Sequence, residues 1–85
     1  MNRKIFKIGR GHSCDIRIQH ESVSALHAWL IVAGDHLLLV DCGTTNGTRV
    51  HTQGLKKITQ TNISKTDRLS LGAYETSVSE LLSQI

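Results

Sequence analysis

The sequence predicts an all-β fold, either a sandwich or a barrel. Short apolar segments recur at roughly the 8–12-residue spacing that such folds show. Several of these segments alternate polar and apolar side chains with the period of two that is typical of a half-buried strand. The chain contains no Pro, so Gly, Asn and Asp alone separate the segments. Only the C-terminal end has a helical pattern.

Length and composition favour a single soluble domain comprising residues 1–85. The longest apolar run, residues 28–33, is too short to span a bilayer, so no membrane association is predicted. No export signal is recognisable, and we therefore expect a cytoplasmic protein in which Cys14 and Cys42 are reduced. The net charge of +3 permits an anionic partner but does not identify one.

The first half of the chain contains four strand candidates. They are the segment of Ile5 and Ile8 and residues 15–19, 27–33 and 36–41. In the second of them, Ile16 and Ile18 alternate with polar neighbours, which predicts one buried face. The pair Gly34-Asp35 separates the last two candidates and predicts a hairpin. Within residues 28–33 we expect Trp29 to be a core or half-buried packing residue rather than a platform for a ligand.

The second half contains shorter strand candidates and one helix. The strand candidates are residues 47–50, 55–59, 62–66, 67–72 and 74–79. The second and third of these are weak, because each contains an almost isolated Ile. At the end of the chain we predict a helix with Ser79 as its N-cap. Its apolar stripe would consist of Leu81, Leu82 and Ile85.

Three polar stretches, residues 9–13, 20–27 and 43–47, each follow one strand candidate and precede another. Alternate loops of a sandwich lie at the same end, so we expect these stretches to converge. Together they offer a guanidinium, several hydroxyls, an amide and glycines, which are the groups that hold a phosphate. No nucleophile–base pair or carboxylate pair accompanies them, which favours binding over catalysis.

The stretch DCGTTNGTRV, residues 41–50, has more polar side chains than a turn requires. Asn46-Gly47 alone supplies a pair that readily adopts positive φ, so Thr44 and Thr45 are additional. A carboxamide carries both a donor and an acceptor, which match the N–H and C=O of an extended peptide. We interpret Gly47 as the residue that makes the bend and Asn46 as the residue that uses it. An ordinary hairpin with an exposed Asn is the alternative.

Several motifs in this order resemble the forkhead-associated (FHA) domain. They are GR at 9–10, DIRI at 15–18, VSALH at 23–27, TTNGTRV at 44–50 and DRLSLG at 67–72. Each motif is weak alone, but their common order with alternating strands between them is specific. The resemblance extends from about residue 5 to about residue 78. It implies a β-sandwich of two twisted, mostly antiparallel sheets with trimmed loops or terminal strands, because the chain is short for this family.

The resemblance also implies a function, because FHA domains bind phosphothreonine peptides with loops at one end of the sandwich. The peptide-binding residues would be Arg10, Ser24, Thr45 and Asn46. The resemblance implies that the first two contact the phosphate, the third the phosphothreonine and the fourth the peptide backbone. The supporting residues would be Gly9, His27 and Gly47. Because it directly precedes an apolar strand, we expect the histidine to be partly buried and hydrogen-bonded rather than a catalytic base.

Ala25 and Leu26 depart from the family, which often has Arg, Asn or Lys between the Ser and the His of this motif. A phosphothreonine carries a charge of about −1.5 to −2 at pH 7, and Arg10 is its only obvious cationic partner. Other basic side chains near enough to contribute would be those of His12, His20 and Arg17. We therefore expect binding that is weak or depends on flanking peptide residues. A phosphate-independent assembly module with a vestigial pocket is the alternative.

Other ligand classes fit the sequence less well. His12, Cys14 and His51 lack the closed spacing of a zinc site. The basic spot in residues 55–58 is too small for a nucleic-acid surface, and residues 9–13 lack the ending of a P-loop. We predict a non-catalytic protein without metal or cofactor, a monomer or weak homo-oligomer. Its partner would be a phosphothreonine-containing protein or peptide in a Ser/Thr kinase pathway.

Overall fold

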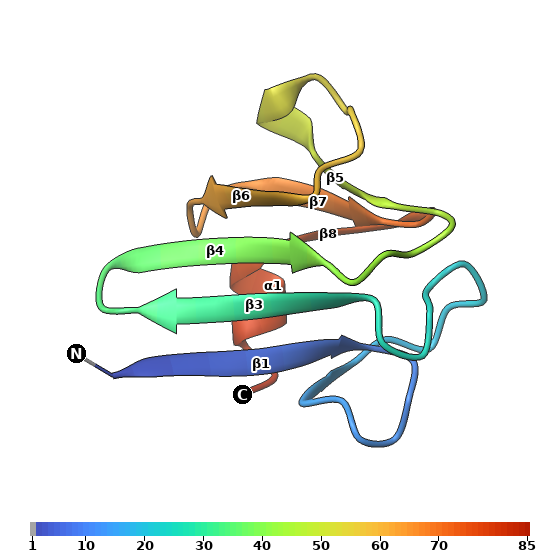
Figure 1. The fold of residues 1–85 in the computed structure, drawn as a ribbon, viewed down its shortest axis with the longest axis horizontal. Helices are drawn as coiled ribbons and strands as arrows, with labels where there is room; N and C mark the ends of the chain where they lie inside the picture. Colours follow the sequence, from blue (N-terminus) through green and yellow to red (C-terminus); the bar gives the residue numbers. More distant parts are fainter. Residues whose placement is uncertain (1) are drawn as a thin grey trace.

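Two β-sheets packed into a sandwich and a short C-terminal helix make up residues 2–85, which the computed structural model describes (Figure 1). The strands are β1 (Arg3–Gly9), β2 (Ile16–Arg17), β3 (Ala28–Ala33), β4 (His36–Asp41), β5 (Thr48–Val50), β6 (Gln60–Ile63), β7 (Arg68–Leu71) and β8 (Tyr74–Ser77). A turn of 3₁₀ helix, η1 (His51–Gln53), follows β5, and α1 (Val78–Leu82) follows β8. The predicted β-sandwich with a short C-terminal helix is confirmed.

The larger sheet has the strand order β2-β1-β3-β4-β6, and the smaller sheet has the order β5-β7-β8. All neighbouring strands are antiparallel except β1 and β2. Strands β3 and β4 form the predicted hairpin, in which Ala33 pairs with His36. Gly34 supplies the positive φ, 60°, that a two-residue hairpin loop needs.

Aliphatic side chains from both sheets form the core between them. The fully buried members on the strands are Ile8, Ile16, Leu30, Leu39, Val50, Leu69 and Leu71. Ile18 is buried as well, so the alternation predicted for residues 15–19 has the correct inward face. Each such side chain stabilises the fold by about 1.5–3 kcal/mol relative to leaving it in water. The core is therefore small and almost entirely Leu, Ile and Val.

The strand predicted at residues 55–59 is wrong. This segment is irregular, and its only strand-like contact is an isolated bridge between Arg49 and Lys57. Gly54 and Leu55 both have positive φ, 77° and 62°, which turns the chain instead of extending it. Strand β6 begins only at Gln60 and ends at Ile63, so the prediction for residues 62–66 is displaced toward the C-terminus.

The predicted N-cap of the C-terminal helix is also wrong. Ser77 caps the helix by accepting a hydrogen bond from the N–H of Glu80 at 3.2 Å, and its hydroxyl donates to the Glu80 carboxylate at 3.3 Å. The spacing is that of the S-x-x-E capping box, but the Glu80 carboxylate accepts from the Ser77 hydroxyl instead of from the Ser77 N–H. Ser79 instead donates its hydroxyl to the carbonyl of Lys65 at 2.8 Å. Ile85 lies beyond the helix and is 52% exposed, so it does not belong to the apolar stripe.

Of the two positions predicted for Trp29, in the core or half-buried, the structure excludes the core. Its neighbours Ala28 and Leu30 point inward, so the alternation of β3 directs Trp29 to the outer face of the larger sheet. It lies there between Lys7 of β1 and Val40 of β4, and 38% of its surface is exposed. An apolar run that continues on both faces of a strand conceals which face is buried.

Three observations complete the description of residues 2–85. No helix among them is long and apolar enough to cross a membrane. No group of three or more His, Cys, Asp or Glu side chains in this part of the chain is arranged to hold a metal ion. Cys14 and Cys42 are both free thiols.

Truncation of a central core residue tests this account of the sandwich. Leu30→Ala is expected to lower the free energy of unfolding by about 2–5 kcal/mol, because Leu30 is fully buried and its loss leaves a cavity. Urea denaturation measures the change. The matched control is Ile5→Ala, on the neighbouring strand but 49% exposed, which should cost about 1 kcal/mol or less. Equal losses for the two variants would contradict the assignment of the core.

Candidate functional site

The three polar stretches singled out in the sequence lie at one end of the sandwich. The chain leaves β1 there, enters β3 there and leaves β4 there, so loops 9–15, 20–27 and 41–47 are neighbours (Figure 1). The two-residue turn 72–73 between β7 and β8 joins them. We call these four loops the rim. The convergence predicted from the sequence is thus observed.

His27 joins two of the rim loops from below. Its side chain is fully buried, and its Nδ1 accepts a hydrogen bond from the N–H of Ser24 at 3.1 Å. Its Nε2 lies 3.0 Å from the carbonyl oxygen of Gly47. Because Nδ1 accepts, the ring proton is on Nε2 and donates to that carbonyl. His27 therefore ties loop 20–27 to loop 41–47, and it is more deeply buried than we expected.

Gly47 is the meeting point of three loops. Its carbonyl accepts from His27 and also from the N–H of Gly72, at 2.9 Å. Its φ of 82° is in the left-handed region that favours glycine. A Cβ at this position would also lie 2.8 Å from Cγ of Lys57, whose side chain crosses the corner. The backbone conformation therefore favours glycine at this corner, and any larger residue would also have to displace the Lys57 side chain.

Loop 9–15 lies directly on loop 20–27. The N–H of Arg10 donates to the carbonyl of Ser24 at 2.9 Å, and the N–H of Gly11 donates to the carbonyl of Ala25 at 3.0 Å. A Cβ at Gly9 would collide with that same Ala25 carbonyl. Gly9 thus permits the close backbone approach that brings Arg10 beside Ser24.

The corner between β4 and β5 is built around the carboxylate of Asp41. The hydroxyls of Thr44 and Thr48 each donate to Asp41 Oδ1 at 2.7 Å. The N–H groups of Gly43 and Thr44 donate to Oδ2 at 2.9 and 3.0 Å. The Thr44 hydroxyl in turn accepts from the N–H of Gly47 at 3.0 Å. Thr44 is therefore a structural part of the corner.

These contacts shift the titration of two side chains. Burial raises the pKa of Asp41, but the hydrogen bonds from Thr44, Thr48 and Gly43 outweigh it, and the net shift is below the ordinary value. The neighbouring Cys42 thiol has a raised pKa because it is partly buried and lies near the charge of Asp41 and the thiol of Cys14. Asp41 is therefore ionised and Cys42 protonated at neutral pH.

Three of the four predicted ligand-contacting side chains are free of intramolecular hydrogen bonds. Within residues 2–85, no hydrogen bond uses the Arg10 guanidinium, the Ser24 hydroxyl or the Thr45 hydroxyl. Arg10 and Thr45 are exposed, and Ser24 is half-buried. The hydroxyl of the nearby Ser22, in contrast, donates to His20 Nδ1 at 2.8 Å and accepts from the N–H of Ala73 at 2.8 Å.

The fourth, Asn46, is partly engaged. Its Nδ2 donates to the carbonyl of Ser22 at 2.9 Å, which adds another connection between loops 41–47 and 20–27. Its Oδ1 has no hydrogen-bond partner within residues 2–85 and is available as an acceptor. Asn46 does not have positive φ, unlike Gly47, so the bend is made by the glycine alone. Arg10 and Asn46 thus both attach to the 20–27 loop, at the same end of the molecule.

Residues 6–72, most of the chain, match the family model of the FHA domain. The chain belongs to the FHA family. Similar solved structures include an FHA domain studied for its phosphothreonine-dependent interactions, with 28% identity, a TM-score of 0.77 and coverage of 88% of this chain and 75% of that one. The FHA domain of the CT664 protein from Chlamydia trachomatis has 28% identity and a TM-score of 0.76, covering 85% of this chain and 71% of that one.

A third similar structure is the FhaA FHA domain in complex with the intracellular domain of Rv3910. It has 28% identity and a TM-score of 0.76, and the match covers 88% of this chain and 79% of that one. A comparison with curated proteins found no significant match. The family resemblance stated from the sequence motifs is therefore confirmed.

Two cations of this FHA domain were missed by the sequence analysis. Lys57 Nζ donates to the carbonyl of Thr45 at 3.1 Å, and Arg49 donates to the carbonyl of Asn46 at 3.0 Å. Arg17, which had been considered, donates its Nε–H to the carbonyl of Arg10 at 3.1 Å. The structure thus adds Lys57 and Arg49 to the cations that the sequence suggested near the rim. No local pattern could have identified Lys57, because an irregular loop brings it back to the corner.

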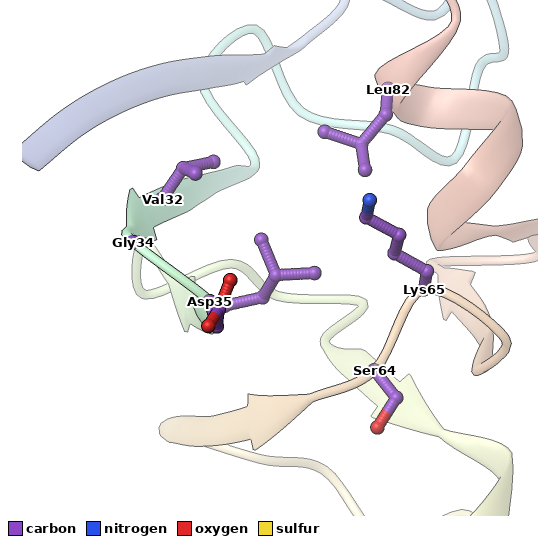
Figure 2. Close-up of a pocket in the computed structure, with 7 residues that line it drawn as sticks. Val32, Gly34, Asp35, Ser64, Lys65 and Leu82 are labelled. Atoms are coloured by element: carbon purple, nitrogen blue, oxygen red, sulfur yellow. The ribbon is translucent and has the colours of Figure 1, made fainter.

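Of two open cavities in the structure, one is far from the rim and the other adjoins it. One of about 540 Å³ lies at the opposite end of the sandwich, where the side chains of Lys65 and Asp35 face it from different segments (Figure 2). No predicted site residue lines it. The other, of about 450 Å³, adjoins the rim. It is lined by Arg49, His51, Leu55, Ser70, Gly72, Ala73 and Glu75.

Removal of the buried imidazole tests its role as the connection between loops. His27→Ala is expected to lower the free energy of unfolding by at least about 2 kcal/mol, because the buried N–H of Ser24 loses its partner and the corner loses a donor. Chemical denaturation gives the change, and hydrogen exchange should show faster exchange at the Ser24 amide. His12→Ala, at an exposed position of the same rim, is the control. If both variants show the same small decrease in the free energy of unfolding, His27 does not hold the loops together.

The lowered pKa of Asp41 predicts a pH-dependent stability. A carboxyl whose folded pKa is depressed stabilises the fold above its unfolded pKa, near 3.8, and this stabilisation disappears as the pH falls through the folded pKa. Asp41→Asn should therefore cost about 1–3 kcal/mol at pH 7, with a smaller difference from wild type below about pH 4. Urea titrations across this range measure it. Asp35→Asn, in the exposed β3–β4 turn, should show neither effect.

Proposed function

We propose that this FHA domain is a phosphothreonine-peptide reader, acting as a non-catalytic adaptor in Ser/Thr kinase signalling. The observation that carries the proposal is the contrast within the rim. His27, Gly47 and Asp41 hold the loops with buried or partly buried hydrogen bonds, whereas the Arg10 guanidinium and the Ser24 hydroxyl have no partner within residues 2–85. Polar groups that are held in position but left unpaired are preorganised to bind a ligand.

The phosphate would be bound by the part of the rim where loops 9–15 and 20–27 meet. Arg10 presents a planar fork of donors that matches two phosphate oxygens, and Ser24 adds a hydroxyl donor. Arg17 and Lys57, each hydrogen-bonded to a rim carbonyl, add positive charge nearby. The interactions of an FHA domain with 28% identity to this chain are phosphothreonine-dependent, which supports the same ligand class.

The peptide on either side of the phosphothreonine would be bound by loop 41–47. Asn46 Oδ1 is free within residues 2–85 to accept a peptide N–H, and the adjacent Thr45 side chain would contact the phosphothreonine itself. The cavity that adjoins the rim, lined in part by Arg49 and Glu75, offers room for a flanking side chain. We therefore expect affinity to depend on the sequence around the phosphothreonine.

A phosphate-independent assembly module remains the second candidate function, and one observation favours it. Leu26 is 40% exposed beside the exposed Ala25, in the loop where the family often carries polar or basic residues. An apolar pair at this position contributes no hydrogen bond to a phosphate and could instead pack against another protein. Size-exclusion chromatography over a range of concentrations, compared with phosphopeptide titration, separates the two functions.

The decisive experiment is titration with a degenerate phosphothreonine peptide library, followed by the best single peptide. Arg10→Ala should weaken binding of that peptide by about tenfold or more, because each charge-assisted hydrogen bond contributes about 1.5–3 kcal/mol. The phosphoserine and unphosphorylated forms of the peptide should bind much more weakly than the phosphothreonine form. Calorimetry or fluorescence anisotropy measures the affinities.

The matched control is Arg68→Ala, which removes an exposed arginine at the start of β7, at the end of the sandwich away from the rim. It should leave the affinity unchanged. Equal affinities for the wild type and Arg10→Ala, or for the phosphorylated and unphosphorylated peptides, would refute the proposed reader.

A further inference from the structure

The outer face of the larger sheet has a continuous group of apolar side chains. Strand register places Ile5, Ile31 and Leu38 in one cross-strand row of β1, β3 and β4. Trp29 and Val40 form the adjacent row, where Lys7 occupies the β1 position. We call these five apolar residues the outer patch.

The outer patch is accessible. Ile5 is 49% and Trp29 38% exposed, and the other three members are partly exposed. In Figure 1 helix α1 passes behind β3, and no element within residues 2–85 lies in front of β1, β3 and β4. Isolated exposed apolar residues are ordinary, but a contiguous group with polar surroundings is typical of a surface that binds another molecule.

The charged side chains at the outward strand positions around the outer patch have one sign, and a nearby carboxylate, that of Asp15, accepts a hydrogen bond from the Lys7 N–H at the edge of β1. Arg3 and Lys7 occupy the outward positions of β1 on either side of Ile5. His36 pairs with Ala33 at the end of the same face, and Gln60 and Asn62 form the far side on β6. None of the outward positions of β1, β3, β4 and β6 within the described chain is Asp or Glu.

We propose that the outer patch binds an amphipathic helix of another protein, with Asp or Glu along one flank of the helix's apolar stripe. Carboxylates on that flank would pair with Arg3 and Lys7, and the apolar stripe would cover Trp29 and Ile31. A second copy of this chain offers no such match, because the outward strand positions around its own outer patch include Arg3 and Lys7 and no carboxylate. Charge complementarity therefore favours an acidic partner over self-association.

The dimensions of the patch fit a helix. Neighbouring strands are about 4.8 Å apart, so β1, β3 and β4 span about 10 Å, close to the diameter of an α-helix. Arg3 and Lys7 are four residues apart on one strand, which corresponds to about 13 Å. Carboxylates seven or eight residues apart on a helix are separated by about 11–12 Å along its axis. A helix lying along β3 would thus bring two carboxylates over the two cations.

This binding surface is separate from the proposed phosphothreonine site. The outer patch lies on the face of the sheet, whereas Arg10, Ser24 and Asn46 lie on the rim at its end. A phosphopeptide and an acidic helix would therefore occupy different surfaces, and one chain could hold both. The inference does not depend on whether the rim binds phosphate.

The experiment uses a display library of helical peptides of about 18 residues, with a fixed leucine stripe and randomised flanking positions. The library is selected on the wild-type chain and counter-selected on Ile5→Lys, which places a charge in the exposed part of the patch. Trp29 is the only tryptophan of the chain, so its emission reports contact with the patch directly. Selected peptides should be rich in Asp and Glu on one flank and should shift that emission to shorter wavelengths in a saturable titration.

The charge of the flank is tested with a matched pair of variants. Lys7→Glu should lower the affinity for the selected peptide by at least about tenfold. Lys56→Glu, in the exposed segment after η1, should leave this affinity unchanged. Urea denaturation checks that both variants are folded. Phosphothreonine peptide binding should be the same in both, which separates failure of this inference from failure of the reader function.

Other results would overturn the inference. These are no enrichment over Ile5→Lys, enrichment without acidic flanks, or equal effects of the two charge variants. Sedimentation showing a concentration-dependent dimer that Ile5→Lys abolishes would assign the outer patch to a second copy. Binding of the chain to vesicles of phosphatidylserine and phosphatidylcholine, lost in Lys7→Glu, would assign it to a membrane surface.

Discussion

The buried imidazole of His27 is the interaction on which the rest of the rim depends. It satisfies a backbone N–H of one loop and a backbone carbonyl of another that is 20 residues away in the sequence. Buried backbone groups without partners are costly, so the loops must come together around this ring. The ring is also rigid and uncharged in this arrangement, which fixes the distance between the two loops. Arg10 and Asn46 reach a common rim because both attach to the loop that His27 anchors.

In the polar corner after β4, some residues support the loop structure and their neighbours are available to bind a ligand. The hydroxyls of Thr44 and Thr48 point toward the Asp41 carboxylate and compensate its partial burial. Thr45 and Asn46 are exposed and do not contact this carboxylate. A glycine corner without these hydroxyls would leave the carboxylate with only two backbone donors. The extra hydroxyl at position 44 therefore belongs to the support of the site, while the one at position 45 is free within residues 2–85.

Short-range alternation, as in Ile16 and Ile18, was sufficient for the all-β class, and Gly34-Asp35 was sufficient for the β3–β4 hairpin. The choice of a sandwich over a barrel came from the family resemblance, and the convergence of three loops follows from the sandwich. The sequence of β3 does not show whether Trp29 faces the core or the solvent, because apolar residues occupy both faces of this strand. The pairing with β1 and β4 places Trp29 in the outward row with Lys7 and Val40. The S-x-x-E spacing of Ser77 and Glu80 would have indicated Ser77 as the N-cap. Ser79 is also a suitable capping residue, and the sequence alone does not show which of the two precedes the helix.

The least predictable parts of the site are those made by contacts distant in sequence. Lys57 reaches the Thr45 carbonyl from an irregular loop, and Ser22 receives the side chain of Asn46 from 24 residues away. No periodic pattern describes such loops, so their side chains are placed only when the two sheets have packed. The motifs identified Arg10, Ser24, Thr45 and Asn46 as candidates, whereas their unequal hydrogen bonding is a property of the folded rim.

Strand β2 is only two residues long, and it pairs with β1 at Ile8 and Gly9 alone. On this edge the Lys7 N–H donates to Asp15 Oδ2, but residues 3–6 have no neighbouring strand on that side within residues 2–85, so an extended chain of another molecule could add there. This edge carries Arg3, Lys4 and Lys7, whose like charges would be brought together if the edges of two copies paired. The cationic side chains at this edge thus disfavour edge-to-edge pairing of two copies and the aggregation that would follow from it.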